Sequence, residues 1–101
     1  MLCKNTVIPQ GVATIGFGAF KNCTSLKSIS IPDSVTYIDN HAFEGCTNLR
    51  SITFTGVTPP EIRNYILDDC TSLTTIYVPA GTKDAYITAL GSDFASKIVE
   101  K

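Results

Sequence analysis

The chain has 101 residues, of which 44% are hydrophobic and 17% are charged, and its formal net charge is −1. This composition excludes a disordered chain, and the absence of any run of Lys or Arg argues against nucleic acid or an anionic membrane as the main partner. No stretch approaches the ~18 consecutive apolar residues of a membrane-spanning helix, so we expect no membrane insertion. The length fits a single domain over residues 1–101.

Residues 1–9 are predicted to form a partial entry repeat, because Ile8-Pro9 matches Ile31-Pro32. They lack the basic start and long apolar core of a signal peptide, so an export signal would lie outside this chain. The first rung buries little apolar surface and should form an edge that an upstream coil or a partner molecule covers. A second copy of the chain is one candidate for that partner, and it would make a homodimer through the N-terminal edge.

Residues 10–81 repeat with a period of 23 residues. Apolar and cysteine positions recur in the pairs Val12 and Val35, Ile15 and Ile38, Phe20 and Phe43, and Cys23 and Cys46. A period of roughly 20–50 residues is typical of a solenoid, whose coils bury their apolar faces against one another. The repeat is interrupted once, since the coil from Phe54 to Val78 has one additional residue, early in residues 55–62.

Short strands are predicted where each coil ends in alternating apolar residues. In residues 26–31 the apolar side chains would face the core while Ser30 faces solvent, because side chains alternate across a strand. Equivalent segments follow at residues 49–54 and 73–78 and should pair in parallel, rung on rung. Pro32 ends its strand because proline cannot donate to the ladder.

Residues 82–101 are predicted to form a helical C-terminal cap, because the repeat period breaks after the last strand. A first short helix would begin after Thr82 as its N-cap and end at Gly91. A second helix would begin at Ser92 and carry Ile98 on its apolar side. Together the two helices would cover the end of the stack.

The cysteines are interpreted mainly as buried free thiols. Cys23, Cys46 and Cys70 hold the same place in successive coils, whereas Cys3 does not. A disulfide between neighbouring coils is within Cα range but is not favoured, because parallel, equivalent side chains rarely satisfy the required torsion. Without a C-x-x-C pair or a His near them in sequence, the cysteines do not indicate a metal site.

The second coil follows the pattern L-x-x-I-x-I-P-x-x-V-x-x-I-x-x-x-A-F-x-x-C. The residues that carry it are Leu26, Ile29, Ile31-Pro32, Val35, Ile38, Ala42-Phe43, Cys46 and Leu49. This pattern resembles the BspA-like bacterial leucine-rich repeats of 23 residues, over about residues 7–90. The resemblance implies a right-handed leucine-rich repeat solenoid of about three to four coils with short parallel strands. It also implies a cell-surface or secreted protein that binds host or matrix proteins, or other cells.

Outward-facing strand positions form three columns across the predicted sheet. The columns are Lys27, Arg50 and Thr74; Ser28, Ser51 and Thr75; and Ser30, Thr53 and Tyr77. They are interpreted either as a polar face that binds a protein or glycan, or as solvated strand surface with good β-propensity. The binding candidates are Lys27, Ser30, Arg50, Thr53 and Tyr77. Tyr and Arg are the residue types most favoured as anchors.

The sequence predicts no catalytic residues, no metal site and no cofactor. His41, the only histidine, occupies a loop position that matches Gly18, and no motif supplies the nucleophile and orienting group that catalysis requires. Asp68-Asp69 lacks the alternating ligand pattern of a calcium loop. We therefore expect a non-enzymatic protein-interaction module that serves adhesion or host and matrix binding. The alternative is a structural or assembly fragment that self-associates through its uncapped N-terminal repeat.

Overall fold

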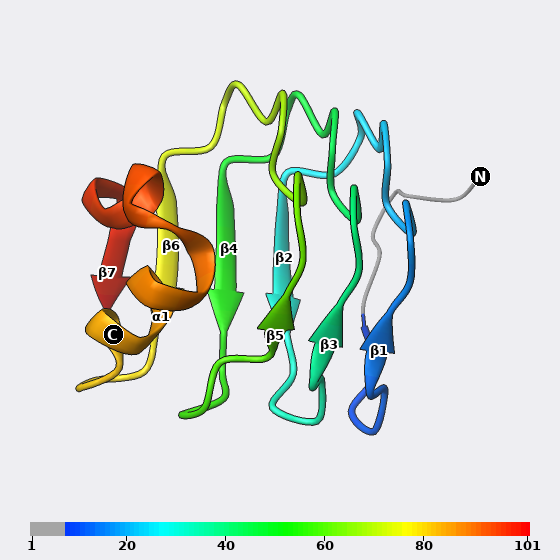
Figure 1. Cartoon of the computed structure of the whole chain (residues 1–101). Coiled ribbons are helices and arrows are strands. Elements are labelled where there is room, and N and C mark those ends of the chain that lie inside the picture. The colour runs from blue at the N-terminus through cyan, green and yellow to red at the C-terminus, as the bar shows by residue number, and fades with distance from the viewer. Residues whose placement is uncertain (1–7) are drawn as a thin grey trace.

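In the computed structural model, which describes residues 8–101, the chain winds through successive coils that stack along one axis (Figure 1). Two parallel sheets flank the core of the stack. One has three strands in the order β1-β3-β5, and the other has four in the order β2-β4-β6-β7. The strand at residues 26–31 and its two successors thus pair in parallel, as predicted. The entry segment 1–7 lies outside the described residues.

The strands are short, as expected for one rung per coil. The four-stranded sheet contains β2 (Ser28–Ile31), β4 (Ser51–Phe54), β6 (Thr75–Val78) and β7 (Ile98–Glu100). The three-stranded sheet contains β1 (Thr14–Ile15), β3 (Tyr37–Ile38) and β5 (Glu61–Ile62). In β2, both isoleucines are buried and both serines are exposed, so the predicted alternation is confirmed.

Equivalent side chains of successive coils lie on one another. Ile52 of β4 is in register with Ile29 of β2 and with Ile76 of β6, and all three are buried. The Phe20 and Phe43 rings stack with centroids 5.2 Å apart and planes inclined by 2°. Contacts of this kind between coils bury the apolar surface that a single coil would leave in water. The chain is therefore a repeat solenoid with α/β elements.

The coil corners repeat as regularly as the strands. Gly18, His41 and Tyr65 all have φ of 60–62°, so His41 takes the left-handed corner position that a glycine occupies in the coil before it. The backbone N–H of Phe20 donates to the Ala42 carbonyl at 2.7 Å, which links adjacent corners. The additional residue of the third coil is absorbed in residues 55–60, between β4 and β5.

The C-terminal cap differs from the prediction. Helix α1 (Lys83–Leu90) is present, but the Thr82 hydroxyl donates to the Pro79 carbonyl at 2.6 Å and makes no cap hydrogen bond. The second helix, predicted over residues 92–101, is present only in its first part and as a 3-10 helix, and the prediction is wrong for the residues that follow. A 3-10 helix, η1 (Ser92–Lys97), ends where β7 begins, and β7 pairs in parallel with β6 (Figure 1). This pairing satisfies the edge of β6, which a helix would have left open.

The cysteine prediction is also wrong in part. Cys46 and Cys70 are free, but Cys23 is disulfide-bonded. The three positions are equivalent in spacing but not in environment, because Cys23 belongs to the first coil of the stack. The free thiols join coils by hydrogen bonds. Cys46 Sγ donates to the Phe20 carbonyl at 3.1 Å, and the hydrogen bond of Cys70 with Cys46, together with burial, raises the pKa of Cys70.

Candidate interaction surface

The outward side chains of β2, β4 and β6 form one continuous polar face. The strand register sets Ser28, Ser51 and Thr75 side by side, and likewise Ser30, Thr53 and Tyr77. Neighbouring members of a column are about 4.8 Å apart, the spacing of paired strands. Two of the columns expected from the sequence are therefore present in register. We call the outward side of these three strands the sheet face.

A shallow depression of about 530 Å³ lies on the sheet face. Three of the five predicted binding residues, Ser30, Thr53 and Tyr77, line it. Their hydroxyls make no hydrogen bond to another described residue, so all three are available to a partner. No Asp or Glu belongs to the described lining of this depression.

The two remaining candidates flank the depression without lining it. Lys27 and Arg50 directly precede β2 and β4, and the Arg50 backbone N–H donates to the Lys27 carbonyl at 2.8 Å. Both side chains are exposed. The third predicted column is thus present in the backbone register. It places two positive charges at the N-terminal ends of β2 and β4.

Lys101 is a residue of this face that sequence reasoning missed. Its Nζ lies 4.6 Å from the centroid of the Tyr77 ring, within the range of a cation–π contact. It also lines the depression. Lys101 reaches this position because the strand pairing of β7 continues with a hydrogen bond from the Lys101 N–H to the Val78 carbonyl at 2.9 Å. The sequence analysis predicted a helix over these residues, and a helix would not have placed Lys101 beside Tyr77.

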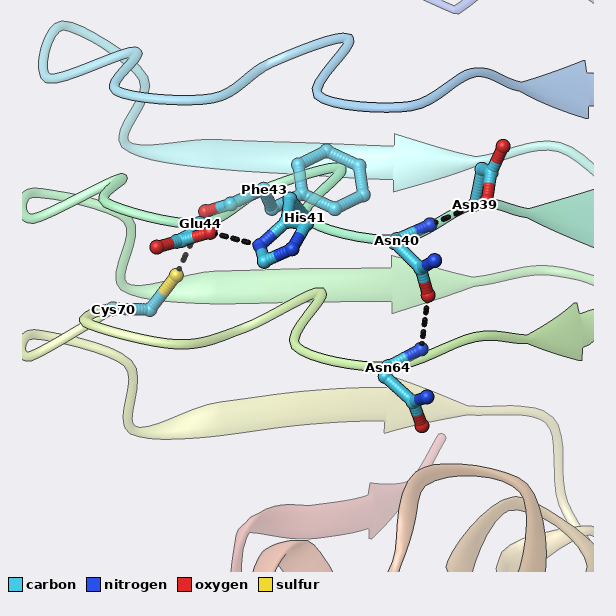
Figure 2. A network of polar contacts seen from close by, with 7 residues as sticks. All are labelled: Asp39, Asn40, His41, Phe43, Glu44, Asn64 and Cys70. Carbon is cyan, nitrogen blue, oxygen red and sulfur yellow. Dashed lines mark hydrogen bonds and ion pairs between the residues drawn. The ribbon is translucent and has the colours of Figure 1, made fainter.

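The polar side chains of the coil corners bond within a corner and to the next coil (Figure 2). Asn40 Oδ1 accepts the backbone N–H of Asn64 at 2.9 Å, and Asp39 Oδ1 accepts that of Asn40 at 2.7 Å. The ring nitrogen Nδ1 of His41 bonds the carboxylate of Glu44 in the same corner. These groups are engaged in contacts within the stack.

His41 lies in a coil corner, as its match to Gly18 indicated, but it packs against neighbouring rings. It is half-buried, since its ring lies between Phe17 and Tyr65 with both centroid distances at 5.3 Å. Because Gly18 has no side chain at the equivalent corner of the first coil, the preceding residue, Phe17, supplies the ring there. The result is an aromatic column along one row of corners.

Residues 8–101 contain no group of three or more His, Cys, Asp or Glu side chains that could hold a metal ion. Within this same part of the chain, no helix is long and apolar enough to cross a membrane.

The fold defines a class, that of parallel repeat solenoids. The family model of the BspA type leucine rich repeat region matches residues 2–94, with 6 copies of the repeat. The chain therefore belongs to this family, as the repeat pattern suggested. Members are typically surface or secreted proteins, and the family suggests a protein-interaction repeat module. A search of curated proteins finds no significant match.

Proposed function

We propose that this chain is a non-enzymatic interaction module of a bacterial cell-surface or secreted protein, and that it serves adhesion by binding a host or matrix protein through the sheet face. The observation that carries the proposal is the strand register that sets Ser30, Thr53 and Tyr77 side by side in one depression. A repeat solenoid uses such an extended face because each coil contributes equivalent side chains to it.

Tyr77 is the expected anchor of the interaction. Its ring is half-buried among the strands and is held on one side by Lys101, so it loses little conformational freedom when a partner covers it. Aromatic side chains held in this way carry a large share of the binding energy in many interfaces. The neighbouring hydroxyls would supply hydrogen bonds that fix the register of the partner.

The charges of the sheet face favour an acidic protein segment as the partner. Lys27 and Arg50 flank the depression, and Lys101 lines it. No Asp or Glu is among the described residues that line it. Complementary charge speeds encounter and weakens with salt, so binding should decrease as ionic strength rises. A glycan could use the same hydroxyls, but an uncharged glycan would bind without this salt dependence.

The test is binding to a panel of immobilised matrix proteins and glycans. The double variant Arg50→Ala, Tyr77→Ala should weaken binding of the captured protein by at least about tenfold, as expected when anchor side chains are truncated. Tyr65→Ala is the control, because Tyr65 is the same residue type, is 58% exposed, and lies on the coil corners away from the sheet face. Unchanged binding by the double variant, with loss in the control, would place the site on the corners and refute the proposal.

A further inference from the structure

Strand β7 is anchored at its C-terminal end by the side chain of Glu100. Oε2 of the Glu100 carboxylate accepts the backbone N–H of Lys83 at 3.0 Å. Lys83 is the first residue of α1, and α1 packs against β7. The hydrogen bond joins two residues that are 17 positions apart in the chain. It therefore ties β7 to the start of the helix as well as to the edge of β6.

The start of α1 needs an acceptor from outside the helix. The first N–H groups of an α-helix have no partner within it, and a capping side chain commonly accepts one of them. Thr82 makes no such hydrogen bond, and its hydroxyl donates to the Pro79 carbonyl instead. Glu100 supplies the missing acceptor. Hydrogen bonds from the backbone N–H groups of Lys83 and Gly81 lower the pKa of Glu100, so its carboxylate is charged at neutral pH and faces the positive end of the helix dipole.

The same strand places Lys101 on the sheet face. Side chains alternate along β7, where Ile98 is buried and Val99 is exposed. By this alternation Glu100 lies on the side of the buried Ile98, and the next residue, Lys101, lies on the outward side. The Lys101 Nζ is found there, 4.6 Å from the centroid of the Tyr77 ring. Fixing Glu100 against α1 therefore fixes the direction in which Lys101 leaves the strand.

We propose that Glu100 is a positioning residue of the sheet face, which holds Lys101 over Tyr77 by anchoring β7 to α1 and so raises the affinity for an acidic partner. This inference rests on the proposed function of the sheet face. Glu100 is not among the described residues that line the depression, so it acts through Lys101. Without the anchor, the three-residue strand β7 frays and Lys101 leaves the Tyr77 ring. The partner then loses both the charge of Lys101 and the fixed position of Tyr77.

The positioning role and a simple charge effect predict opposite results. Glu100 carries a negative charge one residue away from Lys101, so removal of this charge alone would strengthen the binding of an acidic peptide. Loss of the anchor weakens the binding of the same peptide. Glu100→Ala removes the charge and the acceptor, whereas Glu100→Gln removes the charge and keeps an amide oxygen that can accept the Lys83 N–H. Asp84→Asn is the matched charge control, since Asp84 is exposed and lines the same shallow hollow as Glu100.

The test combines hydrogen exchange of the Lys101 amide with the binding of a poly-aspartate peptide at several salt concentrations. The Lys101 N–H donates to the Val78 carbonyl at 2.9 Å, so its exchange reports whether β7 is in place. Glu100→Ala should speed this exchange and weaken peptide binding, each by at least about threefold, and should reduce the salt dependence of binding. Glu100→Gln should keep the exchange rate within about twofold of wild type, and Asp84→Asn should leave it unchanged.

A double-mutant cycle with Lys101→Ala separates positioning from a general loss of structure. Because Glu100 acts through Lys101, Glu100→Ala should weaken peptide binding no further in the Lys101→Ala chain. A Lys101 amide that exchanges in Glu100→Ala as it does in wild type, tighter peptide binding by that variant, or an equal further loss in the Lys101→Ala chain would each overturn the proposal. A wild-type chain that does not bind the peptide would refute the acidic partner of the proposed function and the binding part of this inference, and exchange of the Lys101 amide then decides the positioning by itself.

Discussion

Tyr86 is the side chain that ties the C-terminal cap to the repeats. It is fully buried, its hydroxyl donates to the Gly56 carbonyl at 2.6 Å, and its ring contacts that of Phe54. Burial raises the pKa of Tyr86 from its ordinary value to about 12. In the unfolded chain the same hydroxyl ionises near pH 10. Between these two values the unfolded state has lost a proton that the folded state keeps.

The free energy of unfolding should therefore fall as the pH rises from about 10 to about 12, with a contribution from Tyr86 that approaches about 1.4 kcal/mol per pH unit. Below pH 10 this contribution is fully present. Urea melts of the wild type and of Tyr86→Phe at several pH values would measure it. Tyr86→Phe should lose about 0.5–1.5 kcal/mol at pH 7 through the missing hydrogen bond, and should show a shallower alkaline decline. An equally steep alkaline decline in Tyr86→Phe would exclude Tyr86 as its source.

Single residues of the sheet face show what the sequence could and could not provide. Ser30, Thr53 and Tyr77 were predictable as neighbours because a fixed period, once found, sets which side chains share a column. Lys101 was not, because its position depends on β7, which lies beyond the last repeat. His41 was recognised as the equivalent of Gly18. Its burial depends on contacts with Phe17 and Tyr65. Tyr65 is equivalent to His41 in the repeat, but Phe17 comes one residue before the equivalent position, so the period alone does not bring the three rings together.

The element that most needed the structure is β7. Residues 92–101 contain a plausible cap at Ser92 and apolar residues at helical spacing, so local pattern alone favours a helix. The competing signal is the β-branched pair Ile98-Val99, which suits a strand. The open edge of β6 decides the outcome, because unpaired backbone groups there cost more than a short helix would return. The repeat strands had no such ambiguity, since the same pattern occurs three times.

A matched pair of substitutions tests the role of β7 in closing the stack. Ile98 is 2% exposed and in register with Ile76, whereas Val99 is 44% exposed. Ile98→Asp should destabilise the chain by more than about 3 kcal/mol, because it buries a carboxylate without a partner, and Val99→Asp should change stability by less than about 0.5 kcal/mol. Denaturant melts of the two variants would show the difference. Equal effects would mean that β7 is not packed as the pairing describes.

At the scale of the whole molecule, the two ends of the stack differ while its interior repeats. The interior could be derived from the 23-residue period, because each coil has the same neighbours as the next. The C-terminal cap could not, since the last coil packs against α1 and β7 and not against another repeat. The disulfide at Cys23 and the strand β7 are both features that the repeat period does not predict.

The central claim is that successive coils are joined by one backbone ladder, and amide hydrogen exchange tests it most directly. The N–H groups of His41, Phe43 and Gly45 each donate to a carbonyl of the third coil at 2.8–3.1 Å. These three amides should exchange at least about 100-fold more slowly than in an unstructured chain, because exchange requires the coils to separate. Exchange of all three at the unstructured rate would contradict the stacked architecture.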